Sequence, residues 1–200
     1  MKTVIFDFGN VVAFFDHWKT LNRLTHLTDM PAKEMFDTVY VGQLEDDFES
    51  GKINDREFLD HVIQLCRLKC DRDFLAKSIA DIFEPNPEVC DLIDRLHGKV
   101  RLVLGSNTNP VHAAHFVTQF EPILSRFDGI VMSHQVGARK PRPEFFAACH
   151  RHAGGRPDES VFIDDLPANI AGAEAFGFRS IVYRAGDDLA GKLRALGVAL

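Results

Sequence analysis

The sequence has neither the long apolar runs of a membrane protein nor the basic excess of a nucleic-acid binder. No apolar run reaches about 18 residues, so we expect no transmembrane helix. Lys and Arg number 23 against 29 Asp and Glu, which argues against a dedicated nucleic-acid binder. The first apolar stretch contains the charged residue Asp7, so we expect no signal peptide. We therefore expect a cytoplasmic protein without nucleic-acid or membrane partners.

Cysteine is scarce, at four residues, and repeated or low-complexity segments are missing. The four are Cys66, Cys70, Cys90 and Cys149, and none belongs to a CxxC pair. Cys66 and Cys70 lie one helical turn apart, but without matching His partners they are a weak zinc signature. We expect free, buried thiols. Phenylalanine, by contrast, is abundant at 17 residues and indicates an aromatic core.

Short apolar segments alternate with helical patterns along most of the chain. Strand-like runs occupy 3–6, 100–104, 129–132, 160–163 and 179–183. Helical spacing of apolar residues occupies 87–96, 112–120, 144–152 and 168–176. This alternation predicts βαβ units and hence an α/β fold, a Rossmann-like parallel sheet with helices on both faces. Ligands of such sheets gather at the carboxyl ends of the strands.

Residues 15–85 break the alternation, because they hold several helical patterns and no convincing strand. Asn54, followed by Glu57 three residues later, predicts a capping box at the start of one helix. The segment 84–87, Glu-Pro-Asn-Pro, predicts a break that leads back to the sheet. We expect a core domain of residues 1–14 and 86–200, with residues 15–85 inserted as a helical cap that acts as a lid.

Chemically useful side chains follow four of the predicted strands. They are Asp7 after the first strand, Ser106 and Asn107 after the second, Lys140 beyond the third, and Asp164 and Asp165 after the fourth. Each of them alone has an ordinary explanation as a turn former, a helix cap or a solvated cation. Because the carboxyl ends of parallel strands share one edge of a sheet, the whole set predicts a single site.

These groups suit phosphoryl transfer. A magnesium ion held by Asp7 and Asp165 would offset the repulsion between a carboxylate nucleophile and a phosphate dianion. Hard oxygen ligands of this kind are what Mg²⁺ prefers. The Ser106 hydroxyl and the Asn107 amide can donate hydrogen bonds to phosphoryl oxygens, and Lys140 can balance the charge of the phosphate. We therefore expect Mg²⁺ as the cofactor and a small phosphate ester as the substrate.

The same segments resemble the four motifs of the haloacid dehalogenase (HAD) superfamily. They are Phe6-Asp7-Phe8-Gly9-Asn10-Val11-Val12, Ser106-Asn107-Thr108, Lys140-Pro141-Arg142-Pro143 and Phe162-Ile163-Asp164-Asp165. The resemblance runs through essentially the whole chain, and the insertion after the first strand is similar to the small helical C1 cap of that family. Within the superfamily, the chain resembles the bacterial glucose-1-phosphate phosphatase branch and the phosphatase domain of soluble epoxide hydrolases.

The resemblance implies a role for each position. Asp7 would be the nucleophile that forms an aspartyl-phosphate. The backbone carbonyl of Gly9 would join Asp7 and Asp165 as metal ligands, while Asp164 and Asn169 would act through metal-bound waters. The choice of Asp165 over Asp164 as the direct ligand is a hypothesis. A larger loss of magnesium affinity in Asp164→Ala than in Asp165→Ala would reverse it.

Gly9 departs from the family pattern, in which a second aspartate at this position protonates the leaving group and then activates water. Such catalysis is typically worth about 10²–10⁴-fold. Three explanations stay open: the cap supplies the group, with Asp16 or His17 nearest; the leaving group is already acidic, as in a sugar 1-phosphate; or the protein is slow or inactive. The clustered histidines are expected to be solvated and without a metal role; they are His112, His115, His150 and His152.

Together these features favour an Mg²⁺-dependent phosphatase of a small phosphorylated metabolite, with a sugar phosphate preferred. One alternative is a metal-independent 2-haloacid dehalogenase, which would also use Asp7 but would not need the Asp164–Asp165 pair. A mutase or a phosphonate hydrolase is a second alternative. A third, suggested by Gly9 alone, is a non-catalytic protein that binds a phosphate ligand or regulates a partner.

Overall fold

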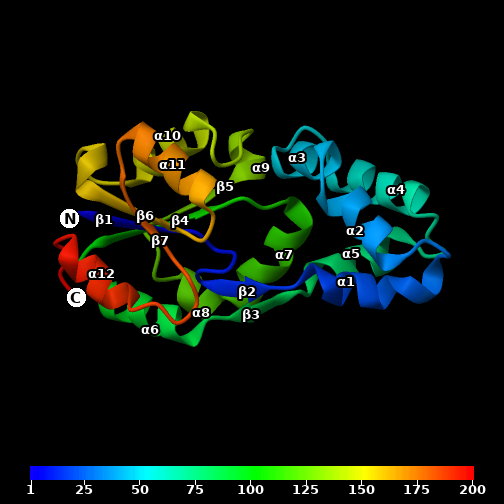
Figure 1. Ribbon diagram of the computed structural model, residues 1–200, viewed down its shortest axis with the longest axis horizontal. Coiled ribbons are helices and arrows are strands. Elements are labelled where there is room, and N and C mark those ends of the chain that lie inside the picture. Colours follow the sequence, from blue (N-terminus) through cyan, green and yellow to red (C-terminus); the bar gives the residue numbers. More distant parts are fainter.

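A parallel sheet of five strands forms the centre of the computed structural model, which describes residues 1–200 (Figure 1). The strands are β1 (Thr3–Phe6), β4 (Arg101–Ser106), β5 (Gly129–Met132), β6 (Ser160–Asp164) and β7 (Arg179–Val182). Their order across the sheet is β5-β4-β1-β6-β7, and every pairing is parallel. The sequence predicts all five strands, and their carboxyl ends lie at one edge of the sheet.

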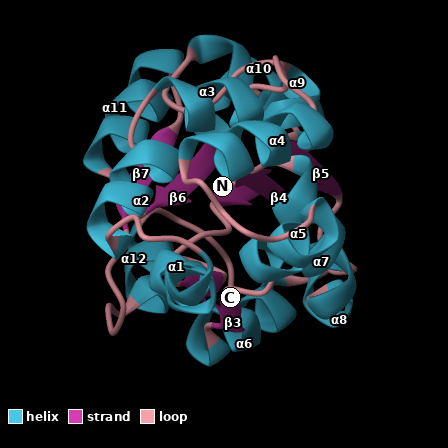
Figure 2. Cartoon of the chain, turned by 90° about the vertical axis from the view of Figure 1, so that its right-hand side faces the viewer, coloured by secondary structure: helices cyan, strands magenta, loops and turns pink.

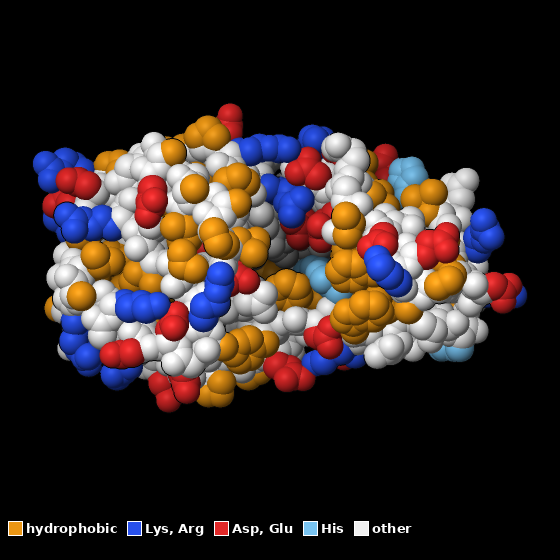
Figure 3. Space-filling model, in the orientation of Figure 1, with side chains coloured by type: hydrophobic (Ala, Val, Ile, Leu, Met, Phe, Trp, Pro, Cys, Tyr) orange, Lys and Arg blue, Asp and Glu red, His pale blue; other side chains and the backbone are white.

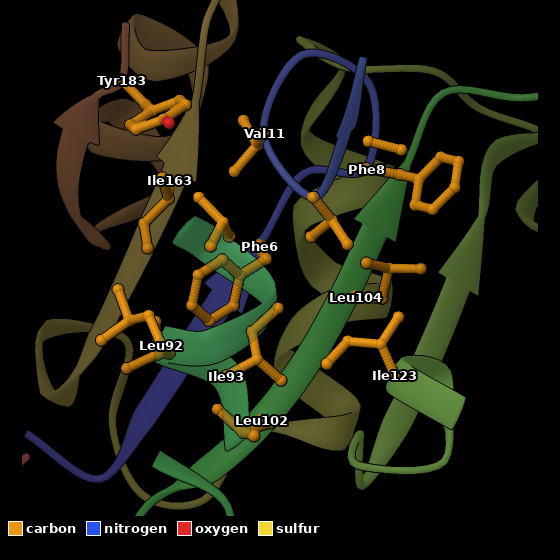
Figure 4. Packing of buried hydrophobic residues seen from close by; sticks show 14 of the residues in the cluster. Phe6, Phe8, Val11, Leu92, Ile93, Leu102, Leu104, Ile123, Ile163 and Tyr183 are labelled. Carbon is orange, nitrogen blue, oxygen red and sulfur yellow. The ribbon is translucent and has the colours of Figure 1, made fainter. Parts of the chain in front are cut away.

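Successive residues of each central strand pack on opposite faces of the sheet, as the strand period requires. Phe6 and Leu104 belong to the hydrophobic cluster of one face (Figure 4), and Ile5 and Phe162 to that of the other. The first face is covered by α6 (Pro87–Leu96), α7 (Pro110–Gln119), α8 (Glu121–Leu124) and α12 (Leu189–Ala195). The second is covered by α10 (Pro143–His152) and α11 (Pro167–Phe176). The predicted α/β fold class is thereby confirmed.

Three of these helices begin one or two residues before the start that the apolar pattern predicts. Their first residues are Pro110, Pro143 and Pro167. Proline suits the first helical position, because its fixed φ is already helical and no intrahelical partner awaits the missing N–H. The side chain of Asn109 then caps α7 by accepting from the backbone N–H of His112 at 2.9 Å.

Five further helices lie at the end of the molecule opposite the two termini (Figures 1 and 2). They are α1 (His17–Leu24), α2 (Ala32–Tyr40), α3 (Gln43–Glu49), α4 (Asp55–Leu65) and α5 (Arg72–Ala80), with a short 3₁₀ turn at Thr25–Leu27. They enclose a separate hydrophobic cluster in which Phe48 and Phe58 stack, their ring centroids 4.0 Å apart. The predicted capping box of α4 is confirmed. The division into a core of 1–14 with 86–200 and a cap of 15–85 stays a prediction.

A two-stranded antiparallel ribbon lies where the chain enters and leaves this group of helices. Its strands are β2 (Ala13–Phe15) and β3 (Phe83–Pro85), with Phe15 opposite Phe83. The expectation of no strand between residues 15 and 85 is therefore wrong at both of its limits. Strands of three residues are too short to show a period of two, and Pro85 reads as a breaker although it stands at the end of its strand.

Two remaining expectations concern the membrane and the thiols. No helix has both the length and the apolar character that crossing a membrane requires. All four cysteines are free thiols as predicted. Cys66 and Cys149 are buried, but Cys70 and Cys90 are only half-buried. Two short elements complete the chain, α9 (Ser133–Val136) and a 3₁₀ turn at Pro157–Glu159.

Candidate active site

Lys140 lies at the centre of the polar groups that follow the strands. Its ammonium group is 2.6 Å from Oδ1 of Asp7 and 2.8 Å from Oδ2 of Asp164, and it donates to the carbonyl of Gly105 at 3.0 Å. The side chain is fully buried. Although burial lowers the pKa of this ammonium group, Asp164 and Asp7 together raise it above its ordinary value. Lys140 is therefore a permanent cation beneath the site.

Asp7 is placed by the central strand. Its backbone N–H still donates to the carbonyl of Ile163 on β6 at 2.9 Å, so the side chain emerges where β1 ends. Burial raises the pKa of the Asp7 carboxyl well above its ordinary value, opposed by Lys140 and reinforced by Asp164. The single ammonium group of Lys140 does not neutralise the buried carboxylates around it. The cluster of carboxylates therefore needs more positive charge to be fully ionised.

The two carboxylates after β6 differ in how their oxygens are used. Asp164 is fully buried and accepts from Lys140, from the backbone N–H of Leu166 and from the amide of Asn169, at 2.8–3.1 Å. Asp165 is half-buried and accepts from the Asn10 amide at 3.1 Å. Burial raises the pKa of Asp165, while this hydrogen bond lowers it. Asp165 thus keeps more of its oxygen lone pairs for a ligand than Asp164 does.

These carboxylates fit a hard divalent cation. One oxygen from each of Asp7, Asp164 and Asp165 lies within 4.8 Å of the others. Three carboxylates against the single charge of Lys140 leave an excess of negative charge, which a cation such as Mg²⁺ would offset. Asn10, at φ 56°, adopts the left-handed conformation that asparagine tolerates, and its hydrogen bond to Asp165 ties the β1 loop to the β6 loop.

The two residues that end β4 differ from each other. Ser106 is buried and lines the same cavity as Asp7, and its hydroxyl makes only a long contact of 3.3 Å with the carbonyl of Asn107. The Asn107 side chain instead holds the backbone of Lys140: its amide donates to the Lys140 carbonyl at 3.1 Å, and its oxygen accepts from the Lys140 N–H at 2.8 Å. Asn107 therefore positions Lys140, a role that the sequence does not predict.

A cavity of about 550 Å³ connects this cluster with helices α1, α2 and α3 at the far end. Figure 3 shows the hollow between the two halves of the molecule. Its polar floor includes all eight predicted site residues except Asp164, and they are Asp7, Gly9, Ser106, Asn107, Lys140, Asp165 and Asn169. Asp164 lies beneath this floor because it is fully buried. The structure therefore brings the predicted residues together around one cavity.

The rest of the cavity lining consists mainly of rings and carboxylates. The rings belong to Phe15, His17, Phe36, Tyr40, Phe83 and His112, and the carboxylates to Glu45 and Glu49. His17 stacks on Tyr40 with ring centroids 3.9 Å apart. Burial lowers the pKa of His17 to about 4 and that of His112 to about 3, so both imidazoles are neutral at pH 7.

A side chain at Gly9 would require the ring of Phe15 to move. A Cβ atom on Gly9 would lie 2.8 Å from Cε1 of Phe15, which is closer than real Cβ contacts come. The ring of Phe15 thus covers the position at which the family pattern places a carboxylate. Asp16 does not replace it: this residue is exposed, and its carboxylate caps α1 by accepting from the Trp18 N–H at 2.8 Å. His17 does reach the cavity, but as a neutral ring.

The cavity lining includes one histidine and three charged residues that the sequence does not predict as site residues. The expectation that His112 is solvated is wrong, because this side chain is 5% exposed and lines the cavity. Glu45 and Glu49 of α3 and Arg139 beside Lys140 also line the cavity. The signals in the sequence are the i,i+4 spacing of the two glutamates and the position of Arg139 next to Lys140. Neither signal shows whether these side chains face the cavity or the solvent.

Comparison with known proteins gives a consistent result. A family model for haloacid dehalogenase-like hydrolases matches residues 1–177. A D-ribitol-5-phosphate phosphatase of Bacteroides thetaiotaomicron is 26% identical over 194 residues, which are 94% of each chain. A HAD-like family hydrolase from Porphyromonas gingivalis has a TM-score of 0.83 at 27% identity, covering 100% of this chain and 99% of that chain.

A further solved structure with this fold is a HAD family enzyme of Bacteroides thetaiotaomicron in complex with magnesium and inorganic phosphate. Its TM-score is 0.83 at 23% identity, covering 97% of this chain and 100% of that chain. The family model extends from before β1 to just beyond α11 and so includes all four strand ends of the site. The chain therefore belongs to the haloacid dehalogenase-like hydrolase family.

Proposed function

We propose that this protein is an Mg²⁺-dependent phosphatase that hydrolyses a phosphate monoester of a small metabolite through an aspartyl-phosphate on Asp7. The observation that carries the proposal is the juxtaposition of Asp7, Asp165 and Lys140 on the floor of one cavity. A volume of about 550 Å³ suits a small metabolite. The family membership and the phosphatase relative support the same reaction type.

Each residue of the floor has a role in this proposal. Asp7, Asp165 and the Gly9 carbonyl would hold Mg²⁺, which neutralises charge between the nucleophile and the phosphate. Asp7 attacks phosphorus, and water later releases the phosphate from it. The Ser106 hydroxyl donates to a phosphoryl oxygen, and Lys140 orients Asp7 while balancing the charge of the phosphate. Asp164 and Asn169 support the site from below, since Asn169 donates to both oxygens of Asp164.

A sugar or polyol phosphate is the proposed substrate class. The relative that matches 94% of its length acts on D-ribitol 5-phosphate by name, and a fold neighbour holds magnesium and phosphate. The cavity wall supports this choice, because flat rings can pack on the C–H faces of a polyol while Glu45 and Glu49 can bind its hydroxyl groups. No nucleic-acid or membrane partner is part of the proposal, and the cytoplasmic location stays a prediction.

A phosphate-release screen tests the proposal directly. The purified chain is incubated with a panel of sugar, polyol, nucleotide and carboxylic-acid phosphates, with Mg²⁺ or with a chelator. We expect phosphate release from polyol or sugar phosphates, loss of release in chelator and recovery when Mg²⁺ is returned. Halide release from a 2-haloacid in chelator would instead support a dehalogenase. Binding of a phosphate analogue without turnover of any ester would support a non-catalytic protein.

A further inference from the structure

The reaction proposed above needs a proton donor for the leaving group, and the β1 loop does not provide one. Phe15 fills the space beside Gly9. The two imidazoles of the cavity are neutral, so they hold no spare proton at pH 7. Burial raises the pKa of the Tyr40 phenol above its ordinary value, which makes it a weaker acid. The remaining candidates on the cavity wall are carboxyl groups of α3.

Glu45 and Glu49 form a pair on that helix. They are four residues apart, so their side chains leave α3 on the same face. Both line the cavity that contains Asp7, and both approach the same guanidinium group. Oε2 of Glu49 is 2.8 Å from Nε of Arg139, whereas Oε2 of Glu45 is 3.9 Å from Nη2 of the same residue. Glu49 therefore takes the close ion pair, and Glu45 does not.

The charges around the pair do not balance. Asp46, between them in sequence, contacts Arg142 at 3.0 Å and Arg139 at 3.5 Å. Three carboxylates thus share two guanidinium groups. Lys52 and Asp47 add one cation and one carboxylate to the set, with Lys52 2.7 Å from Asp47 and 3.4 Å from Asp46, so carboxylates still exceed cations by one. One carboxyl group of the set lacks a close cationic partner, and the distances identify it as Glu45, whose side chain is 23% exposed.

We propose that Glu45 is the general acid of this enzyme and replaces the carboxylate that Gly9 lacks. The inference rests on the proposed phosphatase function. In the first step, a carboxylate oxygen of Asp7 bonds to phosphorus, the ester P–O bond breaks, and its electron pair goes to the leaving oxygen. That oxygen takes the proton of Glu45. In the second step, the oxygen of a water molecule bonds to phosphorus, the P–O bond to Asp7 breaks, and the Glu45 carboxylate accepts a proton from that water.

The protonation of Glu45 agrees with this role. Burial raises its pKa to about 8, with Glu49 and Asp46 adding to the effect and Arg139 opposing it. Burial also raises the pKa of Glu49, while Arg139 and Lys140 lower it. Glu45 therefore holds a proton at pH 7, and a general acid is most effective when its pKa lies near the working pH.

The test compares two leaving groups in one variant. Glu45→Gln keeps the size of the side chain and removes its ability to transfer a proton. With Mg²⁺ present, kcat/KM is measured on two esters. The leaving group of D-ribitol 5-phosphate is a ribitol alkoxide, which needs a proton, whereas that of 4-nitrophenyl phosphate is a stable phenolate, which does not. We expect kcat/KM to fall about 100-fold or more on the first ester and to change less than about threefold on the second.

Asp46→Asn is the matched control, because Asp46 belongs to the same ion-pair cluster but does not line the cavity. It should change both substrates by the same factor. An equal loss on both esters in Glu45→Gln would overturn the proposal in favour of a structural role, and so would an unchanged rate on ribitol 5-phosphate.

The pH profile of the unmodified chain gives a second readout that needs no variant. Activity on the alkyl ester should decline above about pH 8, where Glu45 loses its proton, and the same limb should be missing with the aryl ester. Identical profiles for the two esters would contradict the assignment. If the unmodified chain releases phosphate from neither ester, the proposed phosphatase function fails, and this result differs from a loss confined to Glu45→Gln.

Discussion

At the residue scale, Gly9 and Phe15 depend on each other, because the ring of Phe15 fills the space beside Gly9 that a side chain would occupy. Restoring the aspartate of the family pattern therefore requires the ring of Phe15 to move. We expect Gly9→Asp to destabilise the protein by about 1–3 kcal/mol through overpacking against Phe15. Urea unfolding measures the loss. In a chain that already carries Phe15→Ala, the same Gly9→Asp change should cost less unfolding free energy than it does in the unmodified chain. Equal costs in the two backgrounds would show that the two positions are independent.

Asp7 carries a second prediction at this scale. Asp7→Asn keeps the shape of the side chain but removes the nucleophile, so phosphate release should fall at least about a thousandfold. The fold should persist, because Lys140 retains Asp164 as an ion-pair partner at 2.8 Å. Circular dichroism and a steady-state assay with Mg²⁺ check both parts. Turnover close to that of the unmodified chain would reject Asp7 as the nucleophile.

Single residues also mark where prediction from the sequence stops. The strand-end positions of Asp7, Ser106 and Asp165 follow from the parallel topology, so local patterns are enough to predict that they meet. The cavity-facing positions of His112 and Glu45 depend on how whole helices are placed against the sheet. No local pattern contains that information, since a histidine on a helix looks the same whether it faces solvent or a cavity.

At the scale of the element, the N-terminus of α4 supplies a separate stability prediction. Asn54 and Glu57 each accept from the backbone N–H of the other at 2.9 Å, and α4 contributes Phe58 to the core of the helical end. Asn54→Ala should cost about 1 kcal/mol of unfolding free energy, whereas Asn54→Ser, which can still cap, should cost much less. Denaturant titrations of the two variants compare them. Equal losses would mean that the cap contributes nothing beyond packing.

The elements also differ in how well the sequence predicts them. Four of the five sheet strands are largely buried apolar runs bounded by turns, which leaves little choice of structure, whereas the edge strand β7 buries only Ile181. The ribbon β2–β3 is different, because Phe14 of β2 pairs with Glu84 across nearly 70 residues of chain. Its stability comes from this distant pairing and from contacts such as that of Phe8 with Phe83, whose ring centroids are 5.3 Å apart. Short strands of this kind are products of the tertiary structure, and local propensity does not predict them.

At the scale of the whole molecule, the cavity wall joins the stability of the fold to pH. His112 and His17 are held neutral by burial, so the unfolded chain binds protons that the folded chain excludes once the pH falls below the ordinary imidazole pKa of 6.5. Their contribution to stability is therefore lost as the pH falls from about 6.5 toward 3 and 4, respectively. Glu45 acts in the opposite direction: its raised pKa means that its contribution is lost as the pH rises from about 4.5 to about 8.

Because these effects oppose each other, the informative quantity is the difference between the unmodified chain and a variant. Between pH 7 and pH 5, His112 should remove about 2 kcal/mol of unfolding free energy, since one pKa unit corresponds to about 1.4 kcal/mol. In His112→Gln this part of the decrease in unfolding free energy between pH 7 and pH 5 should vanish, even if the variant is less stable at pH 7. His61→Gln, at an exposed position of α4, is the control and should leave the pH dependence unchanged. Urea titrations at the two pH values decide the matter: parallel losses in the unmodified chain and in His112→Gln would mean that His112 is not held neutral in the fold.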